Sequence, residues 1–431
     1  GTSGAVTLNV EAAQSGVTSL GTLTALTVNG NVSIDGGTVK LDGNYPTGTN
    51  NVALGNTALD SLTSGNENTA IGAVALTANT SGCYNVAVGD NALAANTTGN
   101  DNTTIGMRSL LNNTTGINNT GVGRNALREN TTAAKNTAVG SSSLACNTTG
   151  TRNTAVGFCS LTTNTTGDDN TAFGTESLRA NTTGANNVAV GKNALVANTT
   201  GDENTAVGCN TLGANTTADN NTAIGAFALD TNTEGHSNVA VGRSALTANT
   251  TADNNTAVGF SALSSNTTGA DNAAFGRRAL NSNTTGANNA AIGTCALYSN
   301  TTAGNNTSIG NYSSKLNTTG NSNVAVGYAA LCTNTTGAEN VAVGKDSLKA
   351  STTASSNTAV GCAALFGATT GGANTAMGIY AGYRVTTGSS NALFGYNAGA
   401  NITTGISNHV LGSSAGTDAV FNVTSENNRL V

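Results

Sequence analysis

NTAVGFCSLTTNTTG (residues 153–167) is followed by NTAFGTESLRANTTG (170–184) and then by NVAVGKNALVANTTG (187–201), each starting 17 residues after the last. Aligned on the first Asn, the chain holds 22 such copies from Asn51 to Asn408, with no insertion. We number each copy from 1 to 17. The Asn at position 1 and the Gly at position 5 occur in all 22 copies, and position 4 is always apolar. A fixed period of this kind indicates a solenoid or a repeat array.

The composition excludes several classes of protein. Charged residues are 9% of the 431 residues, against about a quarter in typical globular proteins. Disordered chains are usually rich in charge and Pro, but this chain has 1 Pro and 55 Gly. The thinly spread net charge of −6 gives no reason to expect a nucleic-acid partner. No run of about 18 apolar residues is present, so we expect no membrane insertion.

The cysteines predict no disulfide framework, because their number is odd and they fall at several positions of the repeat without a CxxC pair. We interpret them as free thiols that fill small slots, which favours synthesis in a reducing compartment. The chain opens on Gly1, which cannot be a translation start, so we expect a processed or partial N-terminus. The cysteines are Cys83, Cys146, Cys159, Cys209, Cys295, Cys332 and Cys362.

The repeat predicts one coil of an all-β fold. Its apolar residues lack helical spacing, and Thr, Val, Asn and Gly are mediocre or poor helix formers. Asn-Thr-Ala-Val-Gly alternates and ends on Gly, which predicts a short strand, whereas Asn-Thr-Thr-Gly is typical of a turn. We therefore predict a parallel β-solenoid, a β-roll or β-helix, of 17-residue coils. Each coil would contain a strand, a Gly corner, a short Ala-Leu segment and an Asn-Thr-Thr-Gly corner.

Stacking of the coils explains the strict period. Neighbouring coils would pair at about 4.8 Å, so that equivalent residues form columns and the array becomes a rod of roughly 105 Å. One inserted residue would turn later side chains to the wrong face, and stacked Asn side chains can hydrogen-bond to one another. The predicted Asn ladder includes Asn85, Asn136, Asn153, Asn187, Asn204, Asn255 and Asn323. The predicted Gly corners include Gly89, Gly140, Gly157, Gly191, Gly208, Gly259 and Gly327.

The interior is predicted from alternation along the strand, which sends the Ala and the Val of Asn-Thr-Ala-Val-Gly to opposite faces. We expect the Val column to fill the coil together with the Leu at position 9. The Ala column would then form a second apolar face that packs against identical chains, because a thin coil has little interior of its own. The predicted core includes Val88, Val139, Val156, Phe173, Val190, Leu161, Leu195 and Leu263.

The two ends depart from the repeat. Residues 1–50 contain no 17-residue unit, and the alternation in Gly21–Gly43 predicts short strands of an N-terminal lead-in or cap. Residues 51–416 would form the array, and residues 417–431 a C-terminal transition segment in which the pattern dissolves. The last three copies replace Leu by Gly, as in IYAGYRVTTG, Ile379–Gly388.

Arrays of NTAVG-x-x-AL-x-x-NTTG, preceded by GTLTALTVNGNVSIDGG and followed by GYNAG and ENNRLV, resemble the shaft regions of bacteriophage tail-fibre proteins. The resemblance covers nearly the whole chain. The repeat is also similar to the head repeats of trimeric autotransporter adhesins, whose coils are shorter. Both families imply a parallel homotrimer. A tail fibre is an extracellular part of the virion, and it projects a recognition tip toward a glycan or protein receptor on the host surface.

The resemblance also bears on the end of the chain. In many such fibres a C-terminal chaperone domain directs trimerisation and then cuts itself off. The resemblance leaves open whether such a domain followed Val431. Receptor contact would then lie at the tip or in a C-terminal part that this chain does not include.

We expect a structural protein rather than an enzyme. Catalysis needs acids, bases or metal ligands gathered at one place, whereas His236 and His409 lie far apart in the array. Carboxylates such as Asp168, Asp219 and Asp253 follow the Asn-Thr-Thr corner, and we interpret them as solvated loop charges. The calcium-binding repeat of β-rolls is absent. We therefore expect no cofactor and no metal.

Two alternatives remain open. The chain could be a microbial adhesin or surface filament that carries glycans on its repeated N-T-T sequons, although turn and ladder roles explain the same Asn residues. An ice-binding face would need two Thr on one side of a strand, whereas the adjacent Thr-Thr pair would face opposite ways in an extended strand. The candidate glycosylation sites are Asn96, Asn164, Asn181, Asn198, Asn266, Asn283 and Asn334.

Overall fold

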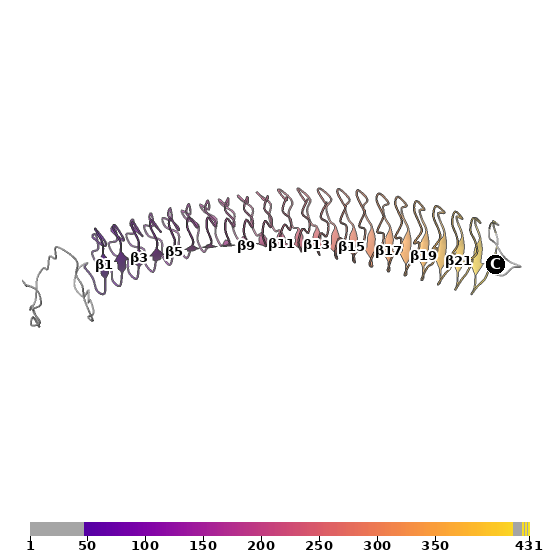
Figure 1. Cartoon of the computed structure of the whole chain (residues 1–431), viewed down its shortest axis with the longest axis horizontal. Coiled ribbons are helices and arrows are strands. Elements are labelled where there is room, and N and C mark those ends of the chain that lie inside the picture. Colours follow the sequence, from indigo (N-terminus) through magenta and orange to yellow (C-terminus); the bar gives the residue numbers. More distant parts are fainter. Residues whose placement is uncertain (1–46, 417–424, 426, 429) are drawn as a thin grey trace, which may run out of the picture. The chain divides into compact units, whose positions relative to one another are not determined.

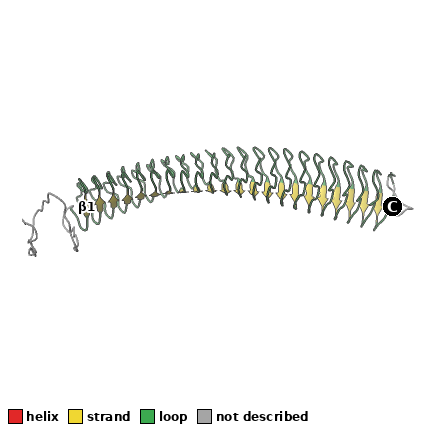
Figure 2. Cartoon of the chain, viewed as in Figure 1, coloured by secondary structure: helices red, strands yellow, loops and turns green. Residues whose placement is uncertain are grey.

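A computed structural model describes residues 47–416, 425, 427, 428, 430 and 431 of the chain, all within one compact unit, Gly43–Val431. These residues form strands and turns, without a helix (Figure 2). Most of the predicted lead-in, residues 1–50, lies outside the described residues. The strands are β1 (Val52–Leu54), β2 (Thr69–Ile71), β3 (Val86–Val88), β4 (Thr103–Ile105), β5 (Thr120–Val122), β6 (Thr137–Val139), β7 (Thr154–Val156), β8 (Thr171–Phe173), β9 (Val188–Val190), β10 (Thr205–Val207), β11 (Thr222–Ile224), β12 (Val239–Val241), β13 (Thr256–Val258), β14 (Ala273–Phe275), β15 (Ala290–Ile292), β16 (Thr307–Ile309), β17 (Val324–Val326), β18 (Val341–Val343), β19 (Thr358–Val360), β20 (Thr375–Met377), β21 (Ala392–Phe394) and β22 (His409–Leu411).

The strands form one 22-stranded parallel sheet in which each strand pairs with the next along the chain (Figure 1). Pairing joins residues 17 apart, as in Thr205 with Thr222 and Val207 with Ile224. Strands at positions 2–4 lie along one side of the stack, and turns complete each coil (Figure 2). The predicted all-β parallel solenoid of 17-residue coils is confirmed.

Tight turns with positive φ close each coil. The position 5 glycines have φ near that of Gly191, 134°, a conformation open almost only to Gly. Positions 7, 9 and 17 also have positive φ, as in Asn193 (56°), Leu195 (51°) and Asn186 (58°). An L-residue in this left-handed region costs about 1–2 kcal/mol. Hydrogen bonds between coils offset that cost; the Leu195 N–H, for example, donates to the Thr211 carbonyl at 3.0 Å.

The interior contains Ala rather than Val from the strands. The middle residue of each strand, such as Ala189, is fully buried and faces the Leu of position 9, such as Leu195. The first and third strand residues point outward, because successive side chains of a strand alternate. The predicted core is therefore right for its leucines: Leu161, Leu195 and Leu263 are fully buried.

The predicted core is wrong for position 4. Val139 is 36% exposed and Phe173 is 56% exposed, and Val88, Val156 and Val190 are only half-buried. Leu from the opposite wall already spans the narrow interior, so the inner strand position beside it is small, Ala in most coils and Thr104 in one, while the larger position 4 residues stay outside. The sequence does indicate that position 4 lies outside, because its residues range in size from Val to Phe, whereas close-packed interiors tolerate little change in volume.

One coil interrupts the apolar interior. Residues 306–322 place Ser308, Ser313 and Ser314 inside, where most coils have Ala, Ala and Leu. The Ser308 and Ser313 hydroxyls lie 2.6 Å apart and hydrogen-bond to each other. The buried apolar residues accordingly form two clusters, one ending at Leu297 and the other starting at Ala325.

The described residues near the C-terminus rejoin the stack. Leu430 pairs in parallel with His409, and the Val431 N–H donates to the His409 carbonyl at 2.9 Å. The Ile406 N–H donates to the Asn427 side chain at 2.7 Å, across 21 residues rather than 17. Residues 427, 428, 430 and 431 thus pair with the last coil at a separation of 21 residues instead of 17.

Candidate functional surfaces

The Asn ladder at position 1 is confirmed as a continuous hydrogen-bonded column. In Asn204, the backbone N–H donates to the Asn187 Oδ1 at 3.0 Å, and Nδ2 donates to the Ala218 carbonyl at 2.8 Å. Asn187 makes the same bond to the Asn170 Oδ1 at 3.1 Å. The seven Asn residues predicted for this ladder are all buried. The ladder satisfies buried amides and ties each coil to the next, which is a structural role.

The seven candidate glycosylation sites form a second Asn ladder at position 12, and this contradicts their assignment as sugar carriers. All seven are fully buried. The Asn198 Nδ2 donates to the Asn181 Oδ1 at 2.9 Å and to the Gly201 carbonyl at 3.0 Å. The Asn198 Oδ1 accepts from the Asn215 Nδ2 at 2.8 Å. A glycan needs this nitrogen in solvent, so the folded coil excludes one.

The Thr-Thr pair beside this ladder also differs from expectation. The two residues do not face opposite sides of a strand, because they lie in a bend. Thr182 is half-buried and donates its hydroxyl to the Thr199 carbonyl at 3.0 Å, whereas Thr183 is exposed. Most coils therefore present a single exposed Thr at this corner; Ser64, Ser81 and Glu234 replace it in three coils.

The seven predicted Gly corners lie where a side chain has no room. All have φ between 131° and 141°, close to the value for Gly191. A Cβ on Gly191 would overlap the backbone carbonyl of Gly208 in the next coil. The corner glycines therefore stack directly upon one another, and the prediction of a structural Gly corner is confirmed.

The outward face of the sheet presents an uncharged apolar column, which we call the outer stripe: the position 4 residues from Leu54 to Leu411. Position 2, mostly Thr or Val, lies beside it. No Lys, Arg, Asp or Glu occurs in any of the 22 strands. A contiguous exposed apolar surface of this kind marks an interaction site. Its members more than about a third exposed are Leu54, Ile71, Ile105, Val139, Phe173, Ile224, Phe275, Ile292, Ile309, Met377, Phe394 and Leu411.

The loop carboxylates have a role that the sequence interpretation missed. At position 16, a side chain accepts the backbone N–H of position 16 in the preceding coil. Asp219 Oδ1 accepts from Asp202 N–H at 2.7 Å, and Asp253 Oδ1 accepts from His236 N–H at 2.7 Å. His236 Nδ1 accepts from Asp219 N–H at 2.9 Å. The frequent Asp, Asn and Ser at this position could have signalled such caps.

The remaining charged and thiol groups lie mostly on the surface. Arg152 Nε donates to Asp169 Oδ1 at 2.6 Å, and this hydrogen bond holds the pKa of the Asp169 carboxyl below its usual value. All seven cysteines are free, six of them half-buried and Cys209 exposed. Among the described residues, no group of three or more His, Cys, Asp or Glu is placed to hold a metal ion.

Comparisons with known proteins give no relative for this chain: no protein-family model, curated protein or solved structure matches it. In the part of the chain that the structure describes, no helix is long and apolar enough to cross a membrane.

Proposed function

We propose that this chain is the shaft of a bacteriophage tail fibre, a stiff parallel homotrimer that holds a recognition tip away from the virion. The observation that carries the proposal is the outer stripe along an unbroken stack of 22 in-register strands. Every coil bonds to the next through backbone and Asn side chains, without an intervening linker. Such a stack resists bending and suits a spacer.

Identical chains are the partners that fit the outer stripe best. A second copy carries the same apolar residue at the same rise per coil, so a parallel copy in register matches every coil along the array. Because the Ala column is buried inside the coil, the column of Val, Ile and Phe at position 4, and not the Ala column, faces the neighbouring chains. The number three comes from the resemblance to tail-fibre shafts.

The oligomeric state of the purified chain tests this proposal. Light scattering after size exclusion should give three times the chain mass of 42.1 kDa. Phe173→Lys/Ile224→Lys/Phe275→Lys places three charges on the outer stripe and should yield monomers, since desolvating a charge in an apolar interface is costly. The matched control, Thr183→Lys/Thr200→Lys/Thr285→Lys, adds the same charges at the exposed Thr corner and should stay trimeric. A monomeric wild-type chain at micromolar concentration would contradict the trimer.

Labelling of whole particles tests the biological setting. Antibodies raised against the chain should decorate the tail fibres of the phage that encodes it. Labelling of a microbial cell surface, in the absence of phage, would favour the adhesin alternative instead. The buried position 12 Asn residues argue against the glycosylated form of that alternative.

A further inference from the structure

Tyrosines gather on one face at the C-terminal end of the array. Of the 8 Tyr in the chain, six lie between residues 298 and 396, and all six stand at position 6, 7 or 10 of their coils. These positions follow the Gly corner, so this face is separate from the outer stripe of the strands. The six are Tyr298, Tyr312, Tyr328, Tyr380, Tyr383 and Tyr396.

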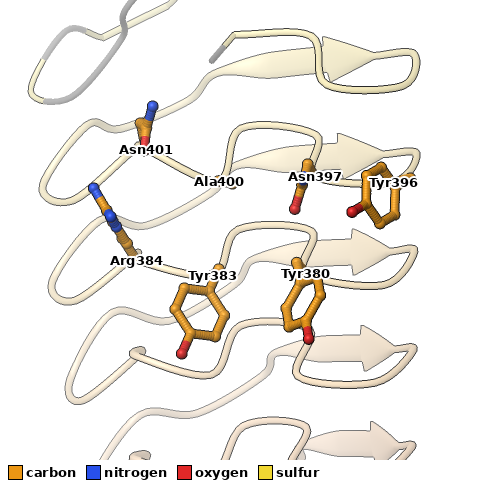
Figure 3. Close-up of a pocket in the computed structure, with 7 residues that line it drawn as sticks. All are labelled: Tyr380, Tyr383, Arg384, Tyr396, Asn397, Ala400 and Asn401. Atoms are coloured by element: carbon orange, nitrogen blue, oxygen red, sulfur yellow. The ribbon is translucent and has the colours of Figure 1, made fainter.

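Three of these tyrosines line a shallow hollow of about 560 Å³. Figure 3 shows that its residues come from two successive coils and project from the same side of the ribbon. The Tyr380 ring packs edge-on against both Tyr383 (5.5 Å between centroids) and Tyr396 (6.4 Å). Tyr380 is 40% exposed and Tyr396 is 51% exposed, so their rings are available to a ligand. The other lining residues are Arg384, Asn397, Ala400 and Asn401.

Contacts between neighbouring coils hold the side chains of the hollow in place. Tyr383 stacks on Phe366 of the preceding coil, with ring centroids 5.1 Å apart and planes 17° apart. The backbone N–H of Arg384 donates to the Ala400 carbonyl at 3.2 Å, which holds the two coils of the hollow in register. The aromatic rings are thus held in place before any ligand arrives, which lowers the entropic cost of binding.

One basic side chain, Arg384, lines the hollow, and no acidic residue does, although the chain as a whole is acidic. Arg384 is exposed and makes no ion pair among the described residues. Along the same face, Lys349 bonds to Asp346 at 2.9 Å, which raises the Lys349 pKa, and its ammonium lies 5.7 Å from the Phe366 ring. Because Lys349 is paired with Asp346, the charge that favours an anionic ligand at the hollow is that of Arg384.

We propose that this hollow binds an anionic saccharide. Aromatic rings present flat faces with negative π density, on which the C–H face of a pyranose ring packs well. The guanidinium of Arg384 can bind a carboxylate or phosphate through two parallel hydrogen bonds, and the Asn397 amide suits sugar hydroxyls. A purely apolar partner would leave the Arg384 charge without a counter-ion. The inference rests on the proposed function for its biological setting, since it adds a ligand to the shaft.

A glycan microarray tests the inference with the full chain as probe. The array should carry uronate-, sialate- and phosphate-bearing oligosaccharides beside their neutral counterparts, which separates the two sources of anionic charge. We expect binding to acidic glycans only. Arg384→Gln and Tyr383→Ala should each weaken binding at least about tenfold, the size expected of one charge-assisted hydrogen bond or one stacking contact. The matched controls, Arg108→Gln on the same face far from the hollow and Tyr84→Ala on another face, should bind like wild type.

Several results would overturn the inference: no bound glycan, equal binding of neutral glycans, or unchanged binding in the Arg384→Gln and Tyr383→Ala variants. The same array is repeated with the monomeric outer-stripe variant, because all residues of the hollow belong to one chain. Binding by that monomer, with a wild type that fails to trimerise, would remove the shaft proposal alone. A trimeric wild type without saccharide binding would remove the inference alone, and would leave the hollow to be covered by another part of the assembly.

Discussion

The middle coils and the C-terminal coils follow the same backbone path but fill it differently. In residues 187–203, the interior holds Ala189, Leu195 and Asn198. In residues 391–407, Leu393, Gly399 and Ile402 occupy the same three positions, and all are buried. The large side chain has moved from position 9 to positions 3 and 12, and an amide ladder has become an apolar column. Position 9 keeps its positive φ, 51° in Leu195 and 59° in Gly399.

Features that both regions share are the ones the fold requires, whereas features that differ between them are ones it tolerates. Both regions keep the position 1 Asn ladder, the Gly corner and the inter-coil backbone bonds. The interior can be rebuilt when its total volume is conserved, as in other protein cores. We therefore expect substitutions at the shared features to lower the stability of the array most. The effect of a substitution at position 3, 9 or 12 should depend on the residues in the neighbouring coils.

The largest effect is expected at the shared Gly corner. Gly191→Ala would combine a Gly-only backbone conformation with overlap on the Gly208 carbonyl, and should destabilise the array by about 4 kcal/mol. Gly395→Ala should cost a similar amount, because this glycine (φ 131°) faces Gly412 in the same way. Denaturant unfolding of the full chain measures both.

Gly201→Ala is the matched control for the corner variants. It lies at position 15, where the next coil already has Ala218, and its φ is not positive. Its Cβ would also meet a backbone carbonyl, that of Ala218 at 2.5 Å, so it carries the overlap without the Gly-only conformation and should cost less than Gly191→Ala. Equal losses for Gly191→Ala and Gly201→Ala would show that the corner has no special requirement.

The second effect concerns the amide ladder that only the middle coils possess. Asn198→Val should destabilise by about 3 kcal/mol, since it removes three buried hydrogen bonds and leaves the Asn181 Oδ1 without a partner. The Gly201 carbonyl and the Asn215 Nδ2 each keep one other bond, to the Asn187 Nδ2 and the Ala218 carbonyl. The converse change, Val385→Asn, should cost about 2 kcal/mol, because its neighbours at position 12, Ala368 and Ile402, offer no amide. Amide hydrogen exchange in the flanking coils locates each loss. If both variants were as stable as wild type, amide and apolar side chains at position 12 would be interchangeable in both regions.

The third effect tests whether the side-chain volume lost at position 9 in the C-terminal coils is compensated by the larger side chain at position 3. A Cβ at Gly382 would lie 2.8 Å from both Leu365 Cδ2 and Leu393 Cδ1. Gly382→Leu alone should therefore destabilise the C-terminal coils by about 2 kcal/mol through overpacking. Adding Leu393→Ala should recover part of that loss, so the double variant is more stable than the sum of the single variants predicts, by about 1 kcal/mol. If the destabilisation of the double variant equals the sum of the two single effects, positions 9 and 3 do not compensate for each other.

The smallest effect lies at the boundary between the two regions. The position 12 ladder ends at Asn334, whose Oδ1 has no hydrogen-bond partner, and the next coil places the unpartnered Ser351 hydroxyl there. Ser351→Asn should extend the ladder by one step and stabilise the array by about 1 kcal/mol. Ser351→Ala serves as the control, since it removes an unsatisfied hydroxyl without adding a partner. The idea fails if Asn at this position stabilises no more than Ala does.

The sequence was sufficient for the coil length, the strand, the Gly corners, the Asn ladder and the buried leucines. These features follow from stacking, which requires the same residue at the same place in every coil. Alternation along Ala189 and Val190 showed that the two face opposite sides, but it carries no information about which side is inside. The width of the closed coil decided that question. It also buried Asn198, whose Asn-Thr-Thr context reads equally well as a glycan acceptor or as a ladder residue.

The remaining features depend on contacts between coils. Asn427 follows Ile406 by 21 residues, so a search for the 17-residue period does not find its return to the stack. Tyr380, Tyr383 and Tyr396 form no local motif and meet only because successive coils bring positions 6, 7 and 10 onto one face. Periodicity in the sequence thus determines the columns, whereas the closed path of the backbone determines which columns are buried, which are exposed and which lie side by side.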